Sequence, residues 1–514
     1  MRAFRTICRE IHERGYAVLL SPFLSVLIGM MVMSVPVNAQ AHEALLSNMD
    51  AAYDDGEFEE SEQVEDPYNS SQGLRVPGEE PTGTQLSQAL DSYLSQNADA
   101  TGVPGIAVAI VDGQRVRYET TLGDCSSAEN TFIIGSLSKS ITAVAVMQLV
   151  EQGLVNLDDP ISTYMSDLQL PDEVTVRALL NQTSGFGYYE SLADARVGDT
   201  LGSFSYANAN YDLLGRLIET VSGQDYGTYV QNHVFRPLNM MQASAGSAAS
   251  LMSSTATPGH RSWFGVPVAD GFVHALGDDS WGNSASGYVR ASLKDMEAYL
   301  MMYLNSGSGV LDADSVHQMV FSRVPDTSGD TYYGMGWTTY AWSDGELVMS
   351  HDGQVENYVA RMCIIPDRDL GIVVLGDAND ELGGNETFFS LADDIVSIAV
   401  GGQPSGVNPS ERIEQHIYTN ATYIAAFIAC MLLVIYAVRS NWQRWRLFSS
   451  IAIHVGIPLF LLAFPRIFEQ MRWRDFFDFY PDQSVVVLMC CGLLIAGGVV
   501  KLIRFYRHTK QEML

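Results

Sequence analysis

A chain of 514 residues, 47% of them hydrophobic, is long enough for two or three domains with a large core. Its 60 acidic residues outnumber its 29 basic ones, which gives a formal net charge of −31. Phosphate binding needs clustered cations, so this balance argues against a nucleic-acid partner.

The first 41 residues have the pattern of an export signal. Basic residues precede a long apolar run at 16–37, and Ala39 and Ala41 are small residues at a spacing that a signal peptidase accepts. An uncleaved N-terminal anchor is the alternative for residues 1–41, because the apolar run is long. Residues 42–85 are strongly acidic and poor in large apolar side chains, which predicts a disordered spacer.

Strand patterns occur at both ends of a predicted domain at residues 86–400. Apolar alternation around an Asp-Gly pair predicts a hairpin at 106–123, and alternating strands return at 333–378. Because both ends supply strands, we expect them to complete one sheet. A last helix is expected at 384–400.

Helical patterns fill the middle of this domain. One helix pattern starts near Ser136 and stops at Gly153, and residues 155–310 are expected to be largely helical with many loops. The predicted fold is therefore α/β, an antiparallel sheet flanked by helices with an inserted helical region.

Lysine is rare in this chain, and one of its four lysines lies in the sequence GSLSKSIT. Lysine can lose its proton when it is desolvated, whereas arginine cannot. Ser136 and Lys139 have the spacing S-x-x-K, which places both side chains on one side of a helix. The backbone amides at the start of that helix would stabilise a developing oxyanion. The alternative is a capping serine followed by a surface lysine.

The stretch TFIIGSLSKSITAVAVMQLVEQGLVNLDDPISTY resembles the nucleophile region of the serine β-lactamase and penicillin-binding protein superfamily. It is most similar to the branch with class C β-lactamases, D-alanyl-D-alanine carboxypeptidases and related esterases. The resemblance spans roughly residues 86–400. Three further motifs follow in the family's order: LLNQTSGF at 179–186, Y-x-N at Tyr206 and Asn208, and H-x-G at His351 and Gly353.

The resemblance implies a role for each catalytic residue. Ser136 would attack a carbonyl group and become acylated, and Lys139 would share its proton. Tyr206 would be the general base that passes a proton to the leaving group and later activates water. Asn208 would orient either the substrate or Lys139.

The resemblance also implies the substrate-binding elements. The oxyanion hole would use the backbone N–H groups of Ser136 and Gln354, the residue after Gly353. His351 would occupy the first position of the third motif, or only hold the edge of its strand. The family chemistry implies neither a metal ion nor an organic cofactor.

One departure from the family bears on the substrate. Asp352 replaces the Thr or Ser whose hydroxyl commonly meets a ligand carboxylate, and Glu356 follows closely. Two such charges would repel an anionic ligand unless Arg361 or Arg290 compensates. The sequence therefore favours esters, amidated peptides or cationic substrates and predicts little β-lactamase activity.

Three apolar segments near the C-terminus approach the ~17–25 residues that a membrane-spanning helix needs. The loop 439–446 has three arginines and no acid, and the C-terminus is basic, so both are expected in the cytoplasm. A linker at 401–416 would then lead from an extracytoplasmic domain to three transmembrane helices within 417–514. The apolar segments are 421–438, 447–464 and 485–503.

These observations predict a multi-pass membrane protein with an extracytoplasmic serine hydrolase domain that acts through an acyl-enzyme. The substrate would be a small acyl compound or a peptide, with cell-wall peptides as one candidate, and the partners would otherwise be membrane lipids. An esterase and a peptidase or carboxypeptidase both fit. The alternatives are a non-catalytic sensor or binding protein that is acylated by its ligand, and a structural or transport protein that works through its helices.

Overall fold

The computed structural model describes residues 80–246, 255–327, 329, 331–342, 345–439, 450–468 and 470–512. The predicted export signal or anchor and nearly all of the acidic spacer lie outside the described residues. The chain forms two compact units. We call the unit that runs to Pro409, without Trp263–Gly265, the sheet unit, and the unit that contains Ser410 onwards the helical unit.

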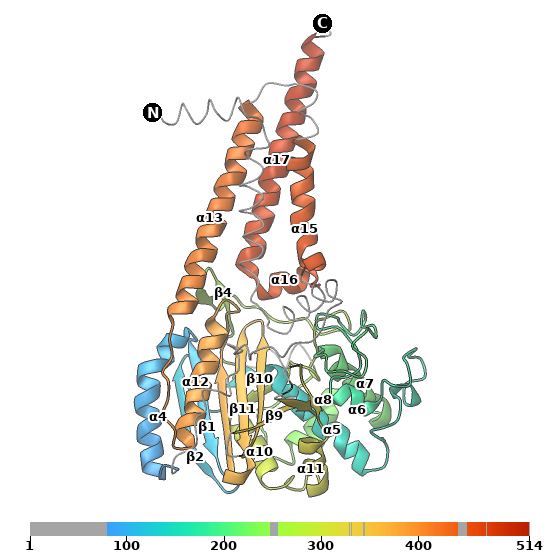
Figure 1. The fold of residues 1–514 in the computed structure, drawn as a ribbon, viewed down its shortest axis with the longest axis vertical. Coiled ribbons are helices and arrows are strands. Elements are labelled where there is room, and N and C mark those ends of the chain that lie inside the picture. The colour runs from blue at the N-terminus through green and yellow to red at the C-terminus, as the bar shows by residue number, and fades with distance from the viewer. Residues whose placement is uncertain are drawn as a thin grey trace, which may run out of the picture. The chain divides into compact units, whose positions relative to one another are not determined.

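The sheet unit is built on one antiparallel sheet of eight strands (Figure 1). Neighbouring strands follow the order β2-β1-β12-β11-β10-β9-β8-β7. The strands are β1 (Gly105–Val111), β2 (Val116–Gly123), β7 (Val324–Pro325), β8 (Tyr332–Gly334), β9 (Trp337–Ala341), β10 (Leu347–Val355), β11 (Tyr358–Ile365) and β12 (Leu370–Gly376).

Strands from both ends of the unit meet inside this sheet, as the sequence predicted. β1 pairs with β2 in the predicted hairpin and with β12 on its other side, where Ile106 lies opposite Gly376. The strands expected at 333–378 supply β8 to β12. The predicted α/β fold is thereby confirmed.

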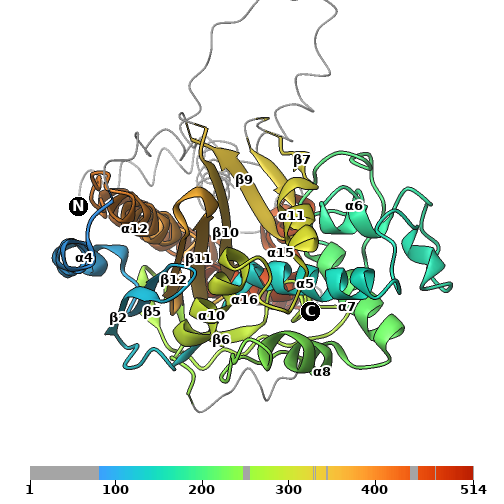
Figure 2. The same cartoon turned by 90° about the horizontal axis from the view of Figure 1, so that it is seen from below.

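Two helical layers cover the two faces of the sheet. Figure 2 shows α4 and α12 on one side and α5, α7 and α8 on the other. Alternate side chains of β1 pack into the two layers, because successive residues of a strand point to opposite faces. The helices are α4 (Gly83–Asn97), α5 (Ser138–Glu151), α6 (Val176–Leu180), α7 (Asn208–Ser222), α8 (Tyr226–Val230), α10 (Leu293–Leu304), α11 (Ala313–Phe321) and α12 (Gly384–Ala399).

Helix α5 lies in the interior of the sheet unit. Every residue from Ser138 to Leu149 is buried, and the apolar sequence of the helix has no polar face to turn towards solvent. Gly153, with φ of +68°, follows its C-terminus in the left-handed conformation that favours glycine. Lys139, in the first turn, therefore points into protein rather than into water.

Short strands interrupt the region that the sequence predicted as largely helical. β3 (Thr131–Ile133) pairs with β6 (Arg290–Ser292), and β4 (His260–Trp263) joins β5 (Val266–Val268) and β13 (Ala378–Asn379). Strands of two to four residues carry too little alternation to be found from the sequence. The pair β3–β6 matters for function, because β3 ends just before Ser136.

Both cysteines of the sheet unit, Cys125 and Cys363, are free and buried. Cys125 packs on the α5 side of the sheet and Cys363 on the α12 side.

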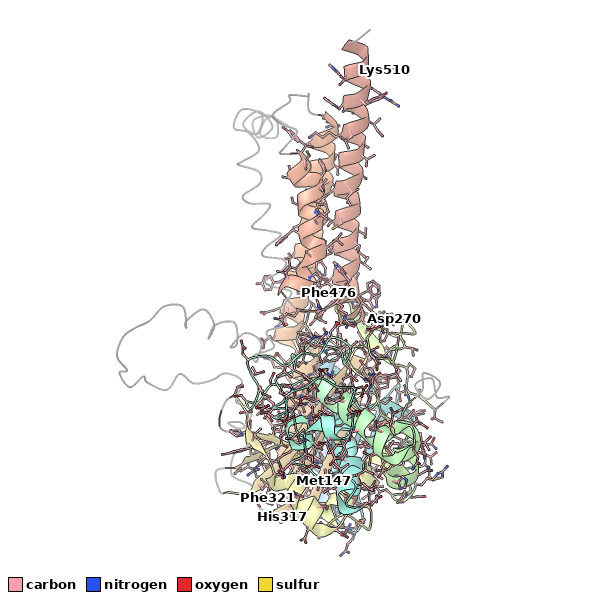
Figure 3. The ribbon with its side chains drawn as sticks, turned by 90° about the vertical axis from the view of Figure 1, so that its right-hand side faces the viewer. Met147, Asp270, His317, Phe321, Phe476 and Lys510 are labelled. Carbon is pink, nitrogen blue, oxygen red and sulfur yellow. The ribbon has the colours of Figure 1, made fainter. Side chains whose placement is uncertain are left out.

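The helical unit contains α13 (Ser410–Arg439), α15 (Ile457–Phe468), α16 (Trp473–Phe479) and α17 (Pro481–Glu512). Figure 3 shows Phe476 of α16 and Lys510 of α17 at opposite ends of this unit. Among the described residues, Ser410–Tyr436 and Pro481–Lys510 form helices long and apolar enough to cross a membrane.

The middle segment of the three that the sequence predicted is shorter. Its apolar helix covers Ala452–Ile467, which is below the length of the other two. The linker is also shorter than the predicted 401–416, because α13 already begins at Ser410.

Candidate active site

Ser136 lies in a tight turn immediately before the central helix. The 3-10 turn Gly135–Leu137 follows β3, and α5 begins at Ser138 rather than at Ser136 itself. The Ser136 side chain is partly exposed, whereas the residues on either side of it are buried. The fold thus presents one hydroxyl group at the edge of an otherwise closed core.

Lys139 is fully buried and contacts three acceptors. Its Nζ donates to Ser136 Oγ at 3.0 Å, to Asn208 Oδ1 at 2.6 Å and to the carbonyl oxygen of Ser286 at 2.7 Å. Burial lowers the pKa of Lys139 to about 7, although the Asp212 carboxylate opposes this shift. At neutral pH a substantial fraction of this lysine is therefore a neutral amine able to accept a proton.

Tyr206 completes the group of side chains around Ser136. It lies two residues before α7, and its ring centroid is 4.7 Å from Lys139 Nζ. Burial raises the pKa of Tyr206 well above its usual value, and a hydrogen bond with Ser136 only partly offsets this effect. The site thus holds a neutral phenol, which can relay a proton but is a poor base by itself.

Two glycines allow the turn that carries Ser136 to touch strand β10. Gly135 has φ of +57°, and a Cβ atom there would lie 2.5 Å from the backbone nitrogen of Gln354. A Cβ atom on Gly353 would overlap the carbonyl oxygen of Ile134. The backbones at Ser136 and Gln354 are therefore adjoining segments, as an oxyanion hole made from their N–H groups requires.

Replacing Gly353 with alanine is expected to lower the free energy of unfolding by about 1–3 kcal/mol, because the new methyl group must push the Ser136 turn away from β10. Thermal unfolding of the full-length chain in detergent measures this change as a lower Tm. Gly83→Ala is the matched control, because a Cβ atom there meets nothing within 4 Å. An unchanged Tm for Gly353→Ala would contradict the close approach.

His351 lies beside Tyr206 in a neutral state. Burial, reinforced by the charge of Lys139, lowers the pKa of His351 to about 4. Its Nδ1–H donates to the carbonyl oxygen of Asp352 at 2.6 Å, and the hydroxyl of Tyr333 lies 3.3 Å from Nε2. At neutral pH this histidine offers a substrate no positive charge.

The sequence predicted that Asp352 would repel an anionic ligand, and this prediction is wrong. Asp352 and His351 are neighbours on a strand and point to opposite faces of the sheet. The Asp352 carboxylate forms a bidentate pair with Arg361 (2.5 and 2.8 Å), and Arg361 also binds Asp393 of α12. Arg361 therefore compensates the charge of Asp352 on the face away from Ser136.

Glu356 also fails to act as expected, because its carboxylate is buried and paired. Its Oε1 accepts from His274 Nδ1 at 2.7 Å and from the hydroxyl of Tyr288 at 2.9 Å. Burial alone would raise the pKa of Glu356, but the adjacent His274 holds it below its usual value. The predicted repulsion of an anionic ligand by Asp352 and Glu356 is therefore absent.

Asp212 is a residue of the site that the sequence analysis missed. Its two oxygens accept from the backbone N–H of Asn283 (3.1 Å) and from the Asn283 side chain (3.4 Å), which fixes the turn that carries Ser286. The Ser286 carbonyl oxygen is in turn an acceptor for Lys139. The available signal was spacing, since Asp212 lies four residues after Asn208 and so on the same face of α7.

One group of described residues has the geometry to hold a metal ion, away from Ser136. The ligand atoms of Asp124, His260 and Asp377 lie within 4.8 Å of one another. His260 already uses Nδ1 to donate to the Asp377 carbonyl oxygen at 2.9 Å, while its Nε2 lies 3.5 Å from the Asp124 carboxylate. These contacts link β4, the residue before β13 and the loop after β2.

Comparison with known proteins identifies the same region of the chain. The family model for beta-lactamase matches residues 90–388. Protein flp of Staphylococcus aureus is 25% identical over 473 residues, covering 82% of this chain and 91% of that protein. A beta-lactamase of Yersinia enterocolitica is 25% identical over 359 residues, covering 58% of this chain and 88% of that protein.

Solved structures share the fold. The octameric penicillin-binding protein homologue from Pyrococcus abyssi has a TM-score of 0.52 and 24% identity, covering 64% of this chain and 80% of its own. The D-amino acid amidase from Ochrobactrum anthropi SV3 has a TM-score of 0.50 and 20% identity, covering 61% of this chain and 97% of its own.

Proposed function

The chain belongs to the beta-lactamase family, and from that premise we propose that it is a membrane-anchored serine hydrolase that forms an acyl-enzyme on Ser136. The observation that carries this proposal is the 3.0 Å contact between Lys139 Nζ and Ser136 Oγ. Burial makes that amine available in its neutral form near neutral pH, so it can take the hydroxyl proton.

Acylation in this proposal begins when Ser136 Oγ attacks the carbonyl carbon of an ester or amide. Lys139 accepts the serine proton as the new C–O bond forms, and the oxyanion binds the N–H groups of Ser136 and Gln354. The bond to the leaving group then breaks, and Tyr206 relays the proton from Lys139 to the departing alcohol or amine. In the second half, water attacks the ester on Ser136 and the carboxylic acid leaves.

The division of labour between Lys139 and Tyr206 follows from their surroundings. Burial lowers the pKa of Lys139 and raises that of Tyr206, so the lysine suits the role of base and the phenol that of relay. Asn208 orients Lys139 through its 2.6 Å contact. Small esters, amides and peptides all remain candidate substrates.

We place the sheet unit on the extracytoplasmic side of the membrane. The basic loop at 439–446 and the basic C-terminus belong on the cytoplasmic side by the positive-inside rule. One long apolar helix separates the sheet unit from this loop, so the sheet unit lies on the opposite side. The loop and the C-terminus share the cytoplasmic side, so the number of crossings between them must be even. The shorter apolar helix Ala452–Ile467 would then cross together with the two longer ones.

The direct test is to label the full-length chain in detergent with a fluorophosphonate and to locate the adduct by peptide mass spectrometry. Attack of Ser136 on phosphorus with loss of fluoride is expected to put one adduct on this serine. A folded chain that gains no adduct would overturn the proposal. With a simple ester in place of the fluorophosphonate, release of the acid indicates an enzyme, whereas a stable acyl group would favour the sensor.

Asp212→Asn is expected to shift the pH dependence of kcat/KM to lower pH. Activity should rise with pH as Lys139 loses its proton, near its pKa of about 7. Burial raises the pKa of Asp212 only to about 6, so its charge is present at neutral pH and favours the protonated lysine. Removing that charge lowers the pKa of Lys139 further, so the rising limb moves towards acid.

A pH profile on a neutral ester checks this shift. Asp158→Asn is the control: it removes an exposed carboxylate of the same unit and should leave the pH of the rising limb of kcat/KM unchanged. If Asp212 only holds the turn at 283–286, its variant will lose activity equally at every pH, and the electrostatic role is contradicted.

A further inference from the structure

Aromatic side chains gather on one side of Tyr206. The ring of Tyr188 lies 6.0 Å from the ring of Tyr206 and 6.0 Å from the ring of Trp281. Tyr189 packs against both Tyr188 (4.7 Å) and Trp281 (6.5 Å). We call Tyr188, Tyr189 and Trp281 the aromatic wall.

The aromatic wall is held in place by the two loops that supply it. The indole N–H of Trp281 donates to the carbonyl oxygen of Tyr188 at 3.2 Å, which ties the loop before α7 to the loop before β6. Trp281 is 9% exposed, while Tyr188 and Tyr189 are only half-buried. Two rings of the wall therefore keep surface that a bound group can cover.

The aromatic wall lies near the place that the leaving group of a substrate would occupy. The Tyr206 side chain lies close enough to Ser136 for the serine to lower its pKa and, in the proposed mechanism, it hands a proton to the leaving group. The leaving atom must then lie next to the Tyr206 hydroxyl. Because the ring of Tyr188 lies 6.0 Å from the ring of Tyr206, substituents on the departing alcohol or amine can reach the aromatic wall.

The charges around this position favour a neutral group. Lys139 is buried with three acceptors, and His351 is neutral at neutral pH. Arg361 is paired with Asp352 and Asp393 on the opposite face of the sheet. A carboxylate on the leaving group would lose water against aromatic rings without gaining an ion pair from these cations.

We propose that the aromatic wall is a leaving-group subsite that takes a neutral aromatic or bulky apolar alcohol or amine and disfavours one that carries a carboxylate. This inference rests on the proposed acyl-enzyme function and names the class of substrate for that site. It reaches the substrate preference expected from the sequence by a different cause, since Asp352 and Glu356 do not face the ligand.

Three esters of one short acyl group test the subsite in the full-length chain: the benzyl, ethyl and carboxymethyl esters. All three give the same acyl-enzyme, so differences in kcat/KM report the acylation step alone. Covering a phenyl group should raise kcat/KM for the benzyl ester roughly 10- to 100-fold over the ethyl ester. The carboxymethyl ester should fall roughly 10-fold or more below the ethyl ester.

Variants connect the preference to the wall. Tyr188→Ala and Tyr189→Ala should each reduce the ratio of benzyl to ethyl kcat/KM by roughly 5-fold or more, because a ring that the phenyl group contacts is lost. Phe321→Ala is the matched control: this ring is 51% exposed on α11, far along the chain from the wall, and its loss should leave the ratio unchanged (Figure 3).

The two proposals fail in different ways. Equal kcat/KM for benzyl and ethyl esters, or a preference for the carboxymethyl ester, would overturn the aromatic subsite while fluorophosphonate labelling of Ser136 still supports the hydrolase. A ratio that survives in both wall variants would also overturn it. A chain that neither labels nor hydrolyses any ester refutes the proposed function itself.

Discussion

Replacing Lys139 with arginine is expected to lower the rate of Ser136 acylation by about 10⁴-fold, the scale seen when one member of a nucleophile–base unit is removed. A guanidinium cannot lose its proton in a protein, so it cannot accept the proton of the serine. Nor does it match the buried position where one nitrogen meets Ser136, Asn208 and Ser286. The rate of fluorophosphonate labelling measures the effect directly, with Ser136→Ala as the background.

The chain offers a matched control for this substitution. Lys294 lies in the same unit, with 47% of its side chain exposed and with Glu119 and Glu297 as partners, which an arginine can also pair with. Lys294→Arg should therefore label at the normal rate. Lys139→Met, which removes the amine without adding bulk, separates lost chemistry from poor packing. Normal labelling of either Lys139 variant would remove the lysine from the mechanism.

The parts of the fold with strong periodic patterns could be predicted from the sequence. The hairpin at 106–123, the late strands and α5 each contain enough apolar residues in a regular order to specify their type. The pairing of these strands could also be predicted, because strands at the two ends of one domain are expected to join a single sheet. The short strands β3 and β6 could not be found in this way, although they hold Ser136 in place.

Some contacts of the site can be predicted from the spacing of residues in the sequence, whereas others are known only from the tertiary structure. S-x-x-K places Ser136 and Lys139 within one turn, so local geometry nearly determines that they meet. Tyr206 and Asn208 reach Lys139 only because the fold brings a distant segment to it. Asp352 was misjudged because its charge was considered without the strand it occupies. On β10 the residues His351 and Asp352 must face opposite sides, and only the register with Arg361 on β11 reveals the partner.

Asp212 could not be predicted from the sequence for a different reason. It affects Lys139 through its negative charge and through the turn at 283–286, which it holds in place. Both depend on segments about 70 residues or more apart in the chain being brought together. No local pattern encodes such a contact, whereas the low dielectric of the interior makes it matter for the pKa of the lysine.

The second large effect is expected for Tyr206→Phe, which should lower kcat/KM on an alkyl ester by about 10²–10⁴-fold, the usual range for general acid–base catalysis. The ring and its contacts with Tyr188 and Tyr333 remain, so only the hydroxyl that relays the proton is lost. Tyr229→Phe is the control, because this buried tyrosine of α8 stacks on His233 instead.

The choice of leaving group makes this prediction specific to proton relay. An alkoxide must be protonated as it departs, whereas p-nitrophenolate leaves without a proton. If Tyr206 protonates the leaving group, its loss should slow acylation by an alkyl ester far more than acylation by the p-nitrophenyl ester of the same acid. Equal losses on both esters would mean that the hydroxyl acts before the bond breaks, by orienting Ser136, and that Lys139 itself delivers the proton to the leaving group.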